Sequence, residues 1–194
     1  MFSSPLVLQI PSSMQMTEEQ FFEFCQVNRD LRIELNKFGE LIIIPPTGSE
    51  TGNRVGNISG QLWVWSEQDS TGITFSSSTG FKLSTGAERS PDASWIKLER
   101  WNSLSPEQQQ KFAPICPDFV VELKSSSDNL QTLKEKMEEY MNEPEIQLGW
   151  LIDRKQHKVY IYHPGLQEEC LDNPATVSGE LVLPGFILNM SKVW

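Results

Sequence analysis

The chain has 194 residues, enough for one domain with a substantial core, because a domain of about 150 residues already buries roughly 70% of its unfolded surface. Its 16 basic and 26 acidic residues give a formal net charge of -10. This charge argues against a protein that coats DNA or an anionic membrane through a general positive field. The three cysteines have no C-x-x-C spacing, so neither a disulfide framework nor a zinc knuckle is expected.

The N-terminal segment shows no targeting signal. It lacks a basic region, and its apolar run at residues 6–8 is far too short for a signal peptide or a membrane span. We therefore expect a cytoplasmic protein without membrane contact. We also expect a single domain over residues 1–194, in which residues 1–16 are an N-terminal extension.

A helix and a hairpin are predicted first. Thr17 begins a capping box ahead of an apolar stripe, which predicts a helix over residues 17–28. The segment 31–44 alternates in polarity, turns at Gly39 and stops at two prolines, as a β-hairpin does. Glu34 points away from the apolar face of the first strand of this hairpin.

A longer helix is predicted over residues 47–69, where apolar side chains recur at helical spacing. Glycines also recur at every fourth position in it, at Gly48, Gly52, Gly56 and Gly60. The segment lacks the Lys-Ser/Thr pair of a phosphate-binding loop. We expect the glycine stripe to pack closely against the helix at 129–142 or against a symmetric partner.

The second half of the chain predicts a strand, a helix and a strand in succession, an order that indicates a parallel pair joined by a right-handed crossover. The predicted class is therefore α/β (α+β). The remaining predicted elements, in order, are a meander at 73–96, a short helix from Ser105, a strand at 117–124, a helix at 129–142, strands at 146–153 and 158–164, and short strands from 165 onwards.

The strand at 117–124 carries charges that an ordinary buried strand lacks. Its odd-numbered residues form an apolar face, whereas Glu122 and Lys124 share the other face, about 6 to 7 Å apart. Metal-assisted hydrolysis of phosphodiesters needs carboxylates that converge on Mg²⁺ and a cation near the reacting groups. Glu-x-Lys supplies one carboxylate and the cation.

Two Pro-Asp pairs offer the second carboxylate. Asp118 lies four residues before Glu122 on one strand, roughly 13 Å away, which is too far to share an ion. Asp92 begins another strand that can lie beside it. We therefore predict Asp92 and Glu122 as ligands of Mg²⁺ (or Mn²⁺), with the Leu123 carbonyl as a candidate third ligand. Lys124 is the predicted partner of the water or the scissile phosphate.

Asp92 after a proline, followed by Glu122-Leu123-Lys124, looks like the PD-(D/E)XK nuclease signature. More closely, the segments "IELNKFGELIIIPPTGSETGNR", "RSPDASWI", "PDFVVELKSSSDNLQTLKEKMEEY", "LGWLID" and "LPGF" together resemble a large bacterial family described as putative restriction endonucleases, formerly a domain of unknown function. The similarity covers residues 17–194. It implies a restriction-endonuclease-like fold, with about five core strands in a mixed sheet, and an endonuclease acting on DNA.

The resemblance also implies two further site residues. Glu34 is an extra acidic residue near the site, and Lys136 is a second lysine close to it. Many family members lack a lysine at position 124, so whether Lys124 or Lys136 is the working lysine stays open. The histidine that relatives often carry after the "PTG" turn is absent here, and Thr51 lies near that position. Cutting two strands usually needs two sites, so a homodimer is expected.

Each candidate also has an ordinary structural explanation. Glu122 and Lys124 would form a partly exposed ion pair, and Asp92 would be a turn carboxylate. Glu34 would lie on the polar face of a hairpin, and Lys136 would be a solvated helix lysine.

The competing function is a non-catalytic module of the same fold that binds nucleic acid or a protein. The acidic net charge favours this alternative. Phosphate binding would then depend on a few local cations, namely Arg54, Lys82, Arg89 and Lys124.

Overall fold

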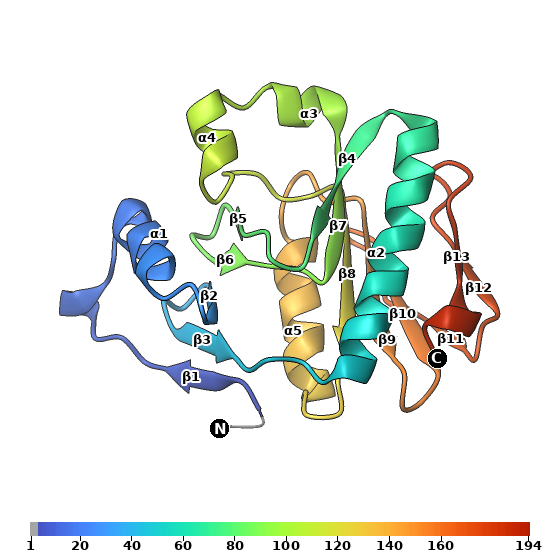
Figure 1. Ribbon diagram of the computed structural model, residues 1–194, viewed down its shortest axis with the longest axis horizontal. Coiled ribbons are helices and arrows are strands. Elements are labelled where there is room, and N and C mark those ends of the chain that lie inside the picture. Colours follow the sequence, from blue (N-terminus) through green and yellow to red (C-terminus); the bar gives the residue numbers. More distant parts are fainter. Residues whose placement is uncertain (1–3) are drawn as a thin grey trace.

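The computed structural model describes residues 4–194 and is built around a six-stranded sheet (Figure 1). Strands β8 and β9 are parallel and are joined through helix α5 (Leu130–Met141), as predicted, and the other neighbours are antiparallel. The sheet is therefore mixed. Its strands, in spatial order, are β11 (Glu169–Asp172), β10 (Lys158–Tyr162), β9 (Leu148–Asp153), β8 (Phe119–Lys124), β7 (Ala93–Lys97) and β4 (Gly72–Ser76).

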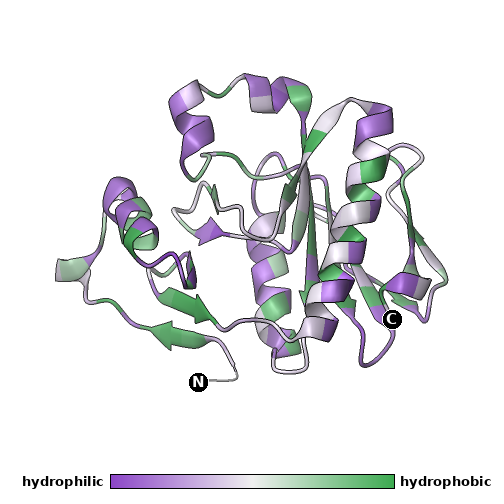
Figure 2. Cartoon of the chain, in the orientation of Figure 1, coloured by the Kyte–Doolittle hydropathy of each residue, from purple (hydrophilic) through white to green (hydrophobic). Residues whose placement is uncertain are grey.

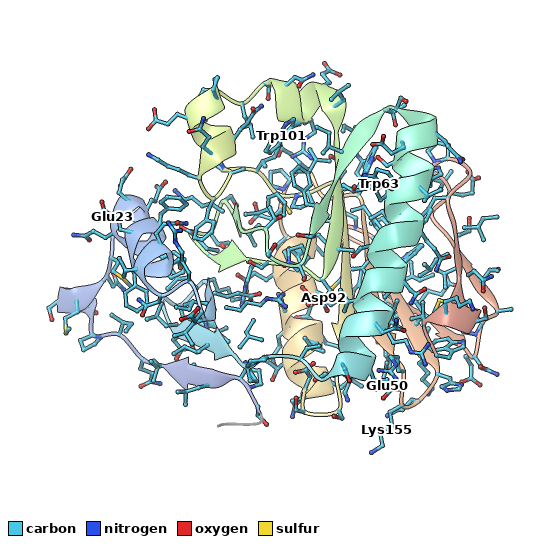
Figure 3. All side chains as sticks on the ribbon, viewed as in Figure 1. Glu23, Glu50, Trp63, Asp92, Trp101 and Lys155 are labelled. Carbon is cyan, nitrogen blue, oxygen red and sulfur yellow. The ribbon has the colours of Figure 1, made fainter. Side chains whose placement is uncertain are left out.

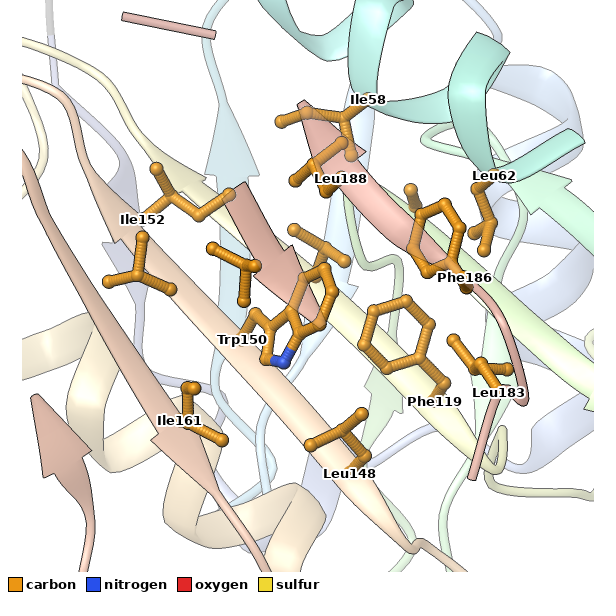
Figure 4. Close-up of a cluster of buried hydrophobic side chains, with 14 of the residues drawn as sticks. Ile58, Leu62, Phe119, Leu148, Trp150, Ile152, Ile161, Leu183, Phe186 and Leu188 are labelled. Carbon is orange, nitrogen blue, oxygen red and sulfur yellow. The ribbon is translucent and has the colours of Figure 1, made fainter. Parts of the chain in front are cut away.

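Both faces of this sheet are covered. On one face, Phe119 and Trp150 join a large core with Ile58 and Leu62 of helix α2 (Ser49–Asp69) and with the C-terminal segment (Figure 4). That segment contains β12 (Thr176–Ser178), β13 (Ile187–Asn189) and the 3-10 helix Met190–Lys192. On the other face, Val120 packs beneath α5. The alternation predicted for β8 is confirmed, and its even-numbered face, which carries Glu122, is the face that α5 covers.

A second sheet lies beside the first and has the order β1-β3-β2-β6-β5. Helix α1 (Glu18–Val27) packs on it through Phe21, which contacts a cluster with Ile33 and Leu41. The strands are β1 (Leu6–Leu8), β2 (Arg32–Leu35), β3 (Leu41–Ile44), β5 (Phe81–Lys82) and β6 (Glu88–Arg89), and the remaining helices are 3-10 helix Ser12–Met14, α3 (Leu98–Asn102) and α4 (Pro106–Gln110).

The meander expected over residues 73–96 is wrong in its connections. Strands β4 and β7 pair in the large sheet, but β5 and β6 between them leave it and join the small sheet, where Leu35 pairs with Glu88. The alternation of side chains identifies strands but not their partners, so it missed this crossing. The crossing brings residues 88–92 between the two sheets.

The first predicted elements are confirmed. Thr17 forms the expected capping box with Gln20, and the β2–β3 hairpin turns at Gly39, whose φ is +76°. The N-terminal residues predicted to be an extension contain β1, which pairs with β3 and so adds an edge to the small sheet. Residues 1–3 of that extension lie outside the described part.

The glycine stripe of α2 does not pack against α5, so that prediction is wrong. A Cβ atom built at Gly48, Gly56 or Gly60 would meet nothing within 4 Å. Helix α2 instead lies on β4, β7 and β13, because Ile58 and Leu62 on its opposite side fill the large core. Packing of the stripe against a symmetric partner stays a prediction. Among residues 4–194, no helix combines the length and apolar character needed to cross a membrane.

Candidate active site

The β7–β8 pairing ends immediately before the predicted carboxylates. The last paired residues are Ala93 and Val121, and Asp92 precedes the ladder. The amide of Asp92 donates to the carbonyl of Val121 at 3.0 Å, and its Oδ2 accepts from the amide of Leu123 at 2.9 Å. Asp92 is thus bound to the residues on both sides of Glu122, which fixes the two carboxylates beside each other where the strands separate.

Lys136 of α5 reaches this point from the face of the sheet that α5 covers. Its Nζ lies 2.8 Å from Glu122 Oε1 and 3.0 Å from Glu34 Oε1. Tyr140, one helical turn later, donates its hydroxyl to Glu122 Oε1 at 3.3 Å. These side chains are buried, so Lys136 is not the solvated helix lysine of the ordinary explanation, and Glu34 is not on an exposed polar face.

Glu34 is held by further donors from β6. The Arg89 guanidinium donates to Glu34 Oε2 at 3.1 Å, and the amide of Ser90 donates to Oε1 at 3.2 Å. Arg89 also donates to Glu139 of α5 at 2.6 Å. Arg89 is therefore buried between two carboxylates, and it is not free to bind phosphate as the sequence suggested.

Arg32 supplies the cation nearest to Asp92. Its guanidinium donates to Asp92 Oδ1 at 3.4 Å and also donates to the carbonyl of Ser90. The side chains of Arg32 and Asp92 are 31% and 14% exposed, so this pair lies nearer to solvent than the contacts of Lys136. Asp92 therefore has a hydrogen-bond donor on each oxygen, one from a side chain and one from the backbone.

The two carboxyl groups that share Lys136 have pKa values shifted in opposite directions. Burial raises the pKa of Glu122 to about 7, although Lys136 opposes the shift, and the charges of Asp92 and Glu34 add to it. Burial would also raise the pKa of Glu34, but Lys136, Arg89 and Arg32 outweigh it and lower this pKa to about 2. Paired carboxyls with separated pKa values are typical of catalytic sites.

Lys124 does not join this arrangement. Its Nζ donates to the carbonyl of Ser125 at 3.3 Å, and among the described residues no ion pair links it to Glu122. Lys124 is the last residue of β8, and a turn follows at residues 126–127. The partly exposed ion pair between Glu122 and Lys124, which the ordinary structural explanation assumed, is therefore not formed among the described residues.

A cavity of about 1000 Å³ opens over these groups, between the β2–β3 hairpin, the start of α2 and the β8–α5 loop with α5. Figure 3 places Asp92 in the middle of the molecule, beside α2 and α5. The cavity is lined by Glu34, Asp92, Glu122, Leu123 and Lys136, and Lys124 does not line it. Five of the six predicted site residues are thus brought together.

The residues present fit a hydrated divalent cation. Within residues 4–194 no group of three or more His, Cys, Asp or Glu side chains could hold a metal ion by itself. Mg²⁺, however, usually takes one or two carboxylates and completes its shell with water and substrate phosphate. Asp92 and Glu122 offer two carboxylates at one cavity wall, and no donor in the described part of the chain reaches Glu122 Oε2.

Asp118 serves a different purpose at the opposite end of β8. It is fully buried, and its Oδ2 accepts from Arg100 at 2.6 Å and from the amide of Lys97 at 2.9 Å. Asp118 therefore fixes the end of β7 and helix α3, away from the cavity, as its spacing from Glu122 indicated.

Sequence reasoning missed several residues of the network. Tyr140 follows Lys136 at helical spacing, so its place on the same side of α5 could have been read from the sequence. Arg32 lies two residues before Glu34 on one strand face, which gives a similar signal. No signal pointed to the pairing of Arg89 with Glu139, because it depends on the crossing of β6 into the small sheet.

Comparisons with known proteins agree with this architecture. The model of the Uma2 family, described as "Putative restriction endonuclease", matches residues 18–191. A crystal structure of a putative nuclease belonging to DUF820 from Anabaena variabilis is similar in fold, with a TM-score of 0.72 and 17% sequence identity, and covers 92% of this chain and 97% of the other. No match was found among curated proteins.

Proposed function

The chain belongs to the family described as "Putative restriction endonuclease", and on this premise we propose that it is a divalent-metal-dependent nuclease that hydrolyses phosphodiester bonds of DNA. One observation carries the proposal. The Lys136 ammonium is held between the carboxylates of Glu34 and Glu122 at a cavity wall that also contains Asp92.

In this proposal Asp92 and Glu122 hold Mg²⁺ or Mn²⁺, with the Leu123 carbonyl as a further ligand. When bound, the ion would polarise the scissile phosphate and lower the pKa of a water molecule that it coordinates. Asp92 is fixed for this task by the Leu123 amide, and Glu122 by Lys136 and Tyr140.

Lys136 is the lysine we assign to the reaction, in preference to Lys124. Its ammonium lies beside the metal-binding carboxylate, where it can orient the attacking water and stabilise the negative charge that develops on the phosphate. The ion pair with Glu34 keeps the Lys136 ammonium protonated and holds it beside Glu122. Lys136 has a raised pKa, because Glu122 and Glu34 outweigh the effect of its burial.

The test is cleavage of plasmid, linear duplex and single-stranded DNA, with and without Mg²⁺ or Mn²⁺. We expect Glu122→Gln and Lys136→Met to lower the metal-dependent rate by about 100-fold or more, as loss of one preorganised charge does. Lys124→Met is the matched control, and we expect it to stay within about threefold of wild type, because Lys124 does not line the cavity and its Nζ donates to the carbonyl of Ser125.

Two outcomes would contradict the assignment. Equal cutting by wild type and Glu122→Gln would identify the activity as a contaminant. A large loss in Lys124→Met with none in Lys136→Met would give the role to the other lysine.

The second candidate is the non-catalytic module on the same fold. The ion pairs at the site favour this candidate, because Arg32 already pairs with Asp92 and Lys136 with Glu122, so both carboxylates are neutralised without a metal ion. Binding of DNA without turnover in either metal would support it. The homodimer expected from the sequence stays a prediction.

A further inference from the structure

The groups proposed for hydrolysis lie below the molecular surface. Glu34 is 2% exposed, Glu122 is 4% and Lys136 is 8%. A phosphodiester on the outside of the molecule cannot contact them. The reacting phosphate must therefore enter the cavity, together with the sugars on either side of it.

The cavity is small compared with a double helix. Its volume is about 1000 Å³, whereas a B-form duplex is wider than its major groove, which alone measures about 12 Å. A duplex is also stiff over about 150 base pairs, so one of its strands cannot be bent into a hole of this size without breaking base pairs. An unpaired strand has the flexibility to enter.

The charges at the cavity disfavour a duplex as well. Nine acidic and four basic residues line it, and three of the four basic residues, Arg32, Arg89 and Lys136, are already paired with carboxylates. Glu135 and Glu138 are exposed at its edge on α5. A duplex carries one negative charge per about 1.7 Å of its axis and a single strand one per about 3.4 Å, so the electrostatic cost is lower for a single strand.

The outer wall of the cavity is apolar. It contains Val7 of β1 and Ile42 and Ile44 of β3, and Figure 2 shows both strands as hydrophobic. Phe38 stands at the β2–β3 turn, lines the cavity and is 73% exposed. Unpaired bases stack on such side chains, whereas the faces of bases within a duplex are already covered by their neighbours.

From depth, size, charge and apolar lining together, we propose that the cavity admits an unpaired stretch of a polynucleotide and excludes a continuous duplex. The scissile phosphate lies against Lys136, and a neighbouring base contacts Phe38 and the apolar wall. This inference rests on the proposed function and names its substrate class. DNA and RNA share the chemistry that this geometry recognises.

The test compares substrates of one sequence in Mg²⁺ or Mn²⁺: single-stranded DNA, single-stranded RNA, a blunt duplex, and a duplex with an unpaired central stretch. We expect cleavage of a single strand and, in the last substrate, cleavage only within the unpaired stretch. The DNA and RNA arms identify the sugar that the cavity accepts. Cleavage of the blunt duplex as fast as the single strand would overturn the inference and leave the proposed nuclease function standing.

A binding measurement separates the inference from the hydrolysis. With the full chain and chelator present, we expect fluorescence anisotropy to show single strands bound at least about tenfold more tightly than duplex. Tighter binding of single strands without any cleavage would reject the proposed nuclease function, but it would support the inference that the cavity admits an unpaired strand. Equal or absent binding of both forms, without cleavage, would overturn the substrate class.

Phe38 provides the matched variant. We expect Phe38→Ala to weaken single-strand binding by about tenfold, since one stacked base contributes on this order. Trp63→Ala is the control, because Trp63 is also an exposed aromatic, 54% exposed, but does not line this cavity. Equal effects of the two substitutions would contradict the proposed contact with the base.

Discussion

At the scale of single residues, Lys136 stabilises two buried carboxylates at once. Replacing it with methionine leaves Glu34 and Glu122 buried without their shared cation. Removing one partner of a buried ion pair usually costs about 3 to 5 kcal/mol. We expect Lys136→Met to lose about 3 kcal/mol of unfolding free energy in urea denaturation at pH 7.

Lys124→Met is again the control, with an expected change below about 0.5 kcal/mol, because the one hydrogen bond of its ammonium within residues 4–194 is to a backbone carbonyl. Glu122→Gln combined with Lys136→Met should recover part of the loss, since one buried charge is then removed. Unchanged stability in Lys136→Met would show that the buried network contributes nothing net.

Glu88 makes stability depend on pH outside the candidate site. It is 5% exposed, its Oε2 has no hydrogen-bond partner within residues 4–194, and burial raises its pKa from 4.5 to about 7, with Lys82 opposing the shift and Glu18 adding to it. Between pH 4.5 and pH 7 the Glu88 carboxyl binds more protons in the folded state than in the unfolded state. Its burial therefore lowers the free energy of unfolding as the pH rises.

We expect Glu88→Gln to gain up to about 3 kcal/mol relative to wild type as pH increases from 4.5 to 7. The measurement is the difference in unfolding free energy between the two proteins at several pH values. Glu169→Gln on the exposed strand β11 should show no such trend. A difference that stays constant with pH would contradict the shifted pKa.

Sequence reasoning went furthest with residues whose spacing alone limits their position. The strand repeat separated Asp118 from Glu122 and pointed to Asp92, and the structure has Asp92 bound beside Glu122. The same repeat placed Lys124 on the face of Glu122, but it carries no information about which contacts the long lysine side chain makes, and its Nζ donates to the Ser125 carbonyl. The contact of Lys136 with Glu34 joins residues 102 positions apart, and no local pattern predicts such a contact.

At the scale of elements, two glycines should respond oppositely to alanine. Gly56 lies within α2, and a Cβ atom there meets nothing within 4 Å. Gly72 begins β4, and a Cβ atom there would overlap the ring of Trp95 and lie 2.5 Å from the Ile96 carbonyl. Trp95 is only 2% exposed, so its ring has little room to move.

We expect Gly56→Ala to raise the unfolding free energy by about 0.5 to 1 kcal/mol, through lower backbone entropy in the unfolded chain. Gly72→Ala should lower it by about 3 kcal/mol through overpacking. Thermal unfolding of both variants measures the contrast. Destabilisation by Gly56→Ala would indicate that this face of α2 is covered in solution.

Helices and hairpins were predictable because their signals are local. The capping box at Thr17, the turn at Gly39 and the apolar repeat of α2 each lie within a few residues of the element they define. The membership of β5 and β6 in the small sheet depends on pairing with β2, about fifty residues earlier in the chain. Periodicity cannot specify such partners.

At the scale of the whole molecule, the net charge of -10 limits how strongly salt can affect binding. Each phosphate contacted by a cation contributes about 0.7 to the slope of log affinity against log salt for single strands. Few cations line the cavity, and Lys37 is an exposed one. We expect a slope no steeper than about -2.

Anisotropy titrations of single-stranded DNA at several salt concentrations measure this slope. Lys37→Ala should reduce it by about 0.7, while Lys111→Ala at the end of α4, which does not line the cavity, leaves it unchanged. A slope of about -5 or steeper would mean that a basic surface outside the cavity dominates binding.

The N-terminal segment that contains β1 lines the cavity but lies outside the region that the family model matches. Ser4, Pro5 and Val7 form part of the cavity wall, yet the family match begins at residue 18. Every group proposed for hydrolysis lies inside the matched region. Grafting a different segment ahead of residue 18 would therefore reshape the entrance while leaving the hydrolytic groups intact, which offers protein engineers a way to alter substrate choice without redesigning the chemistry.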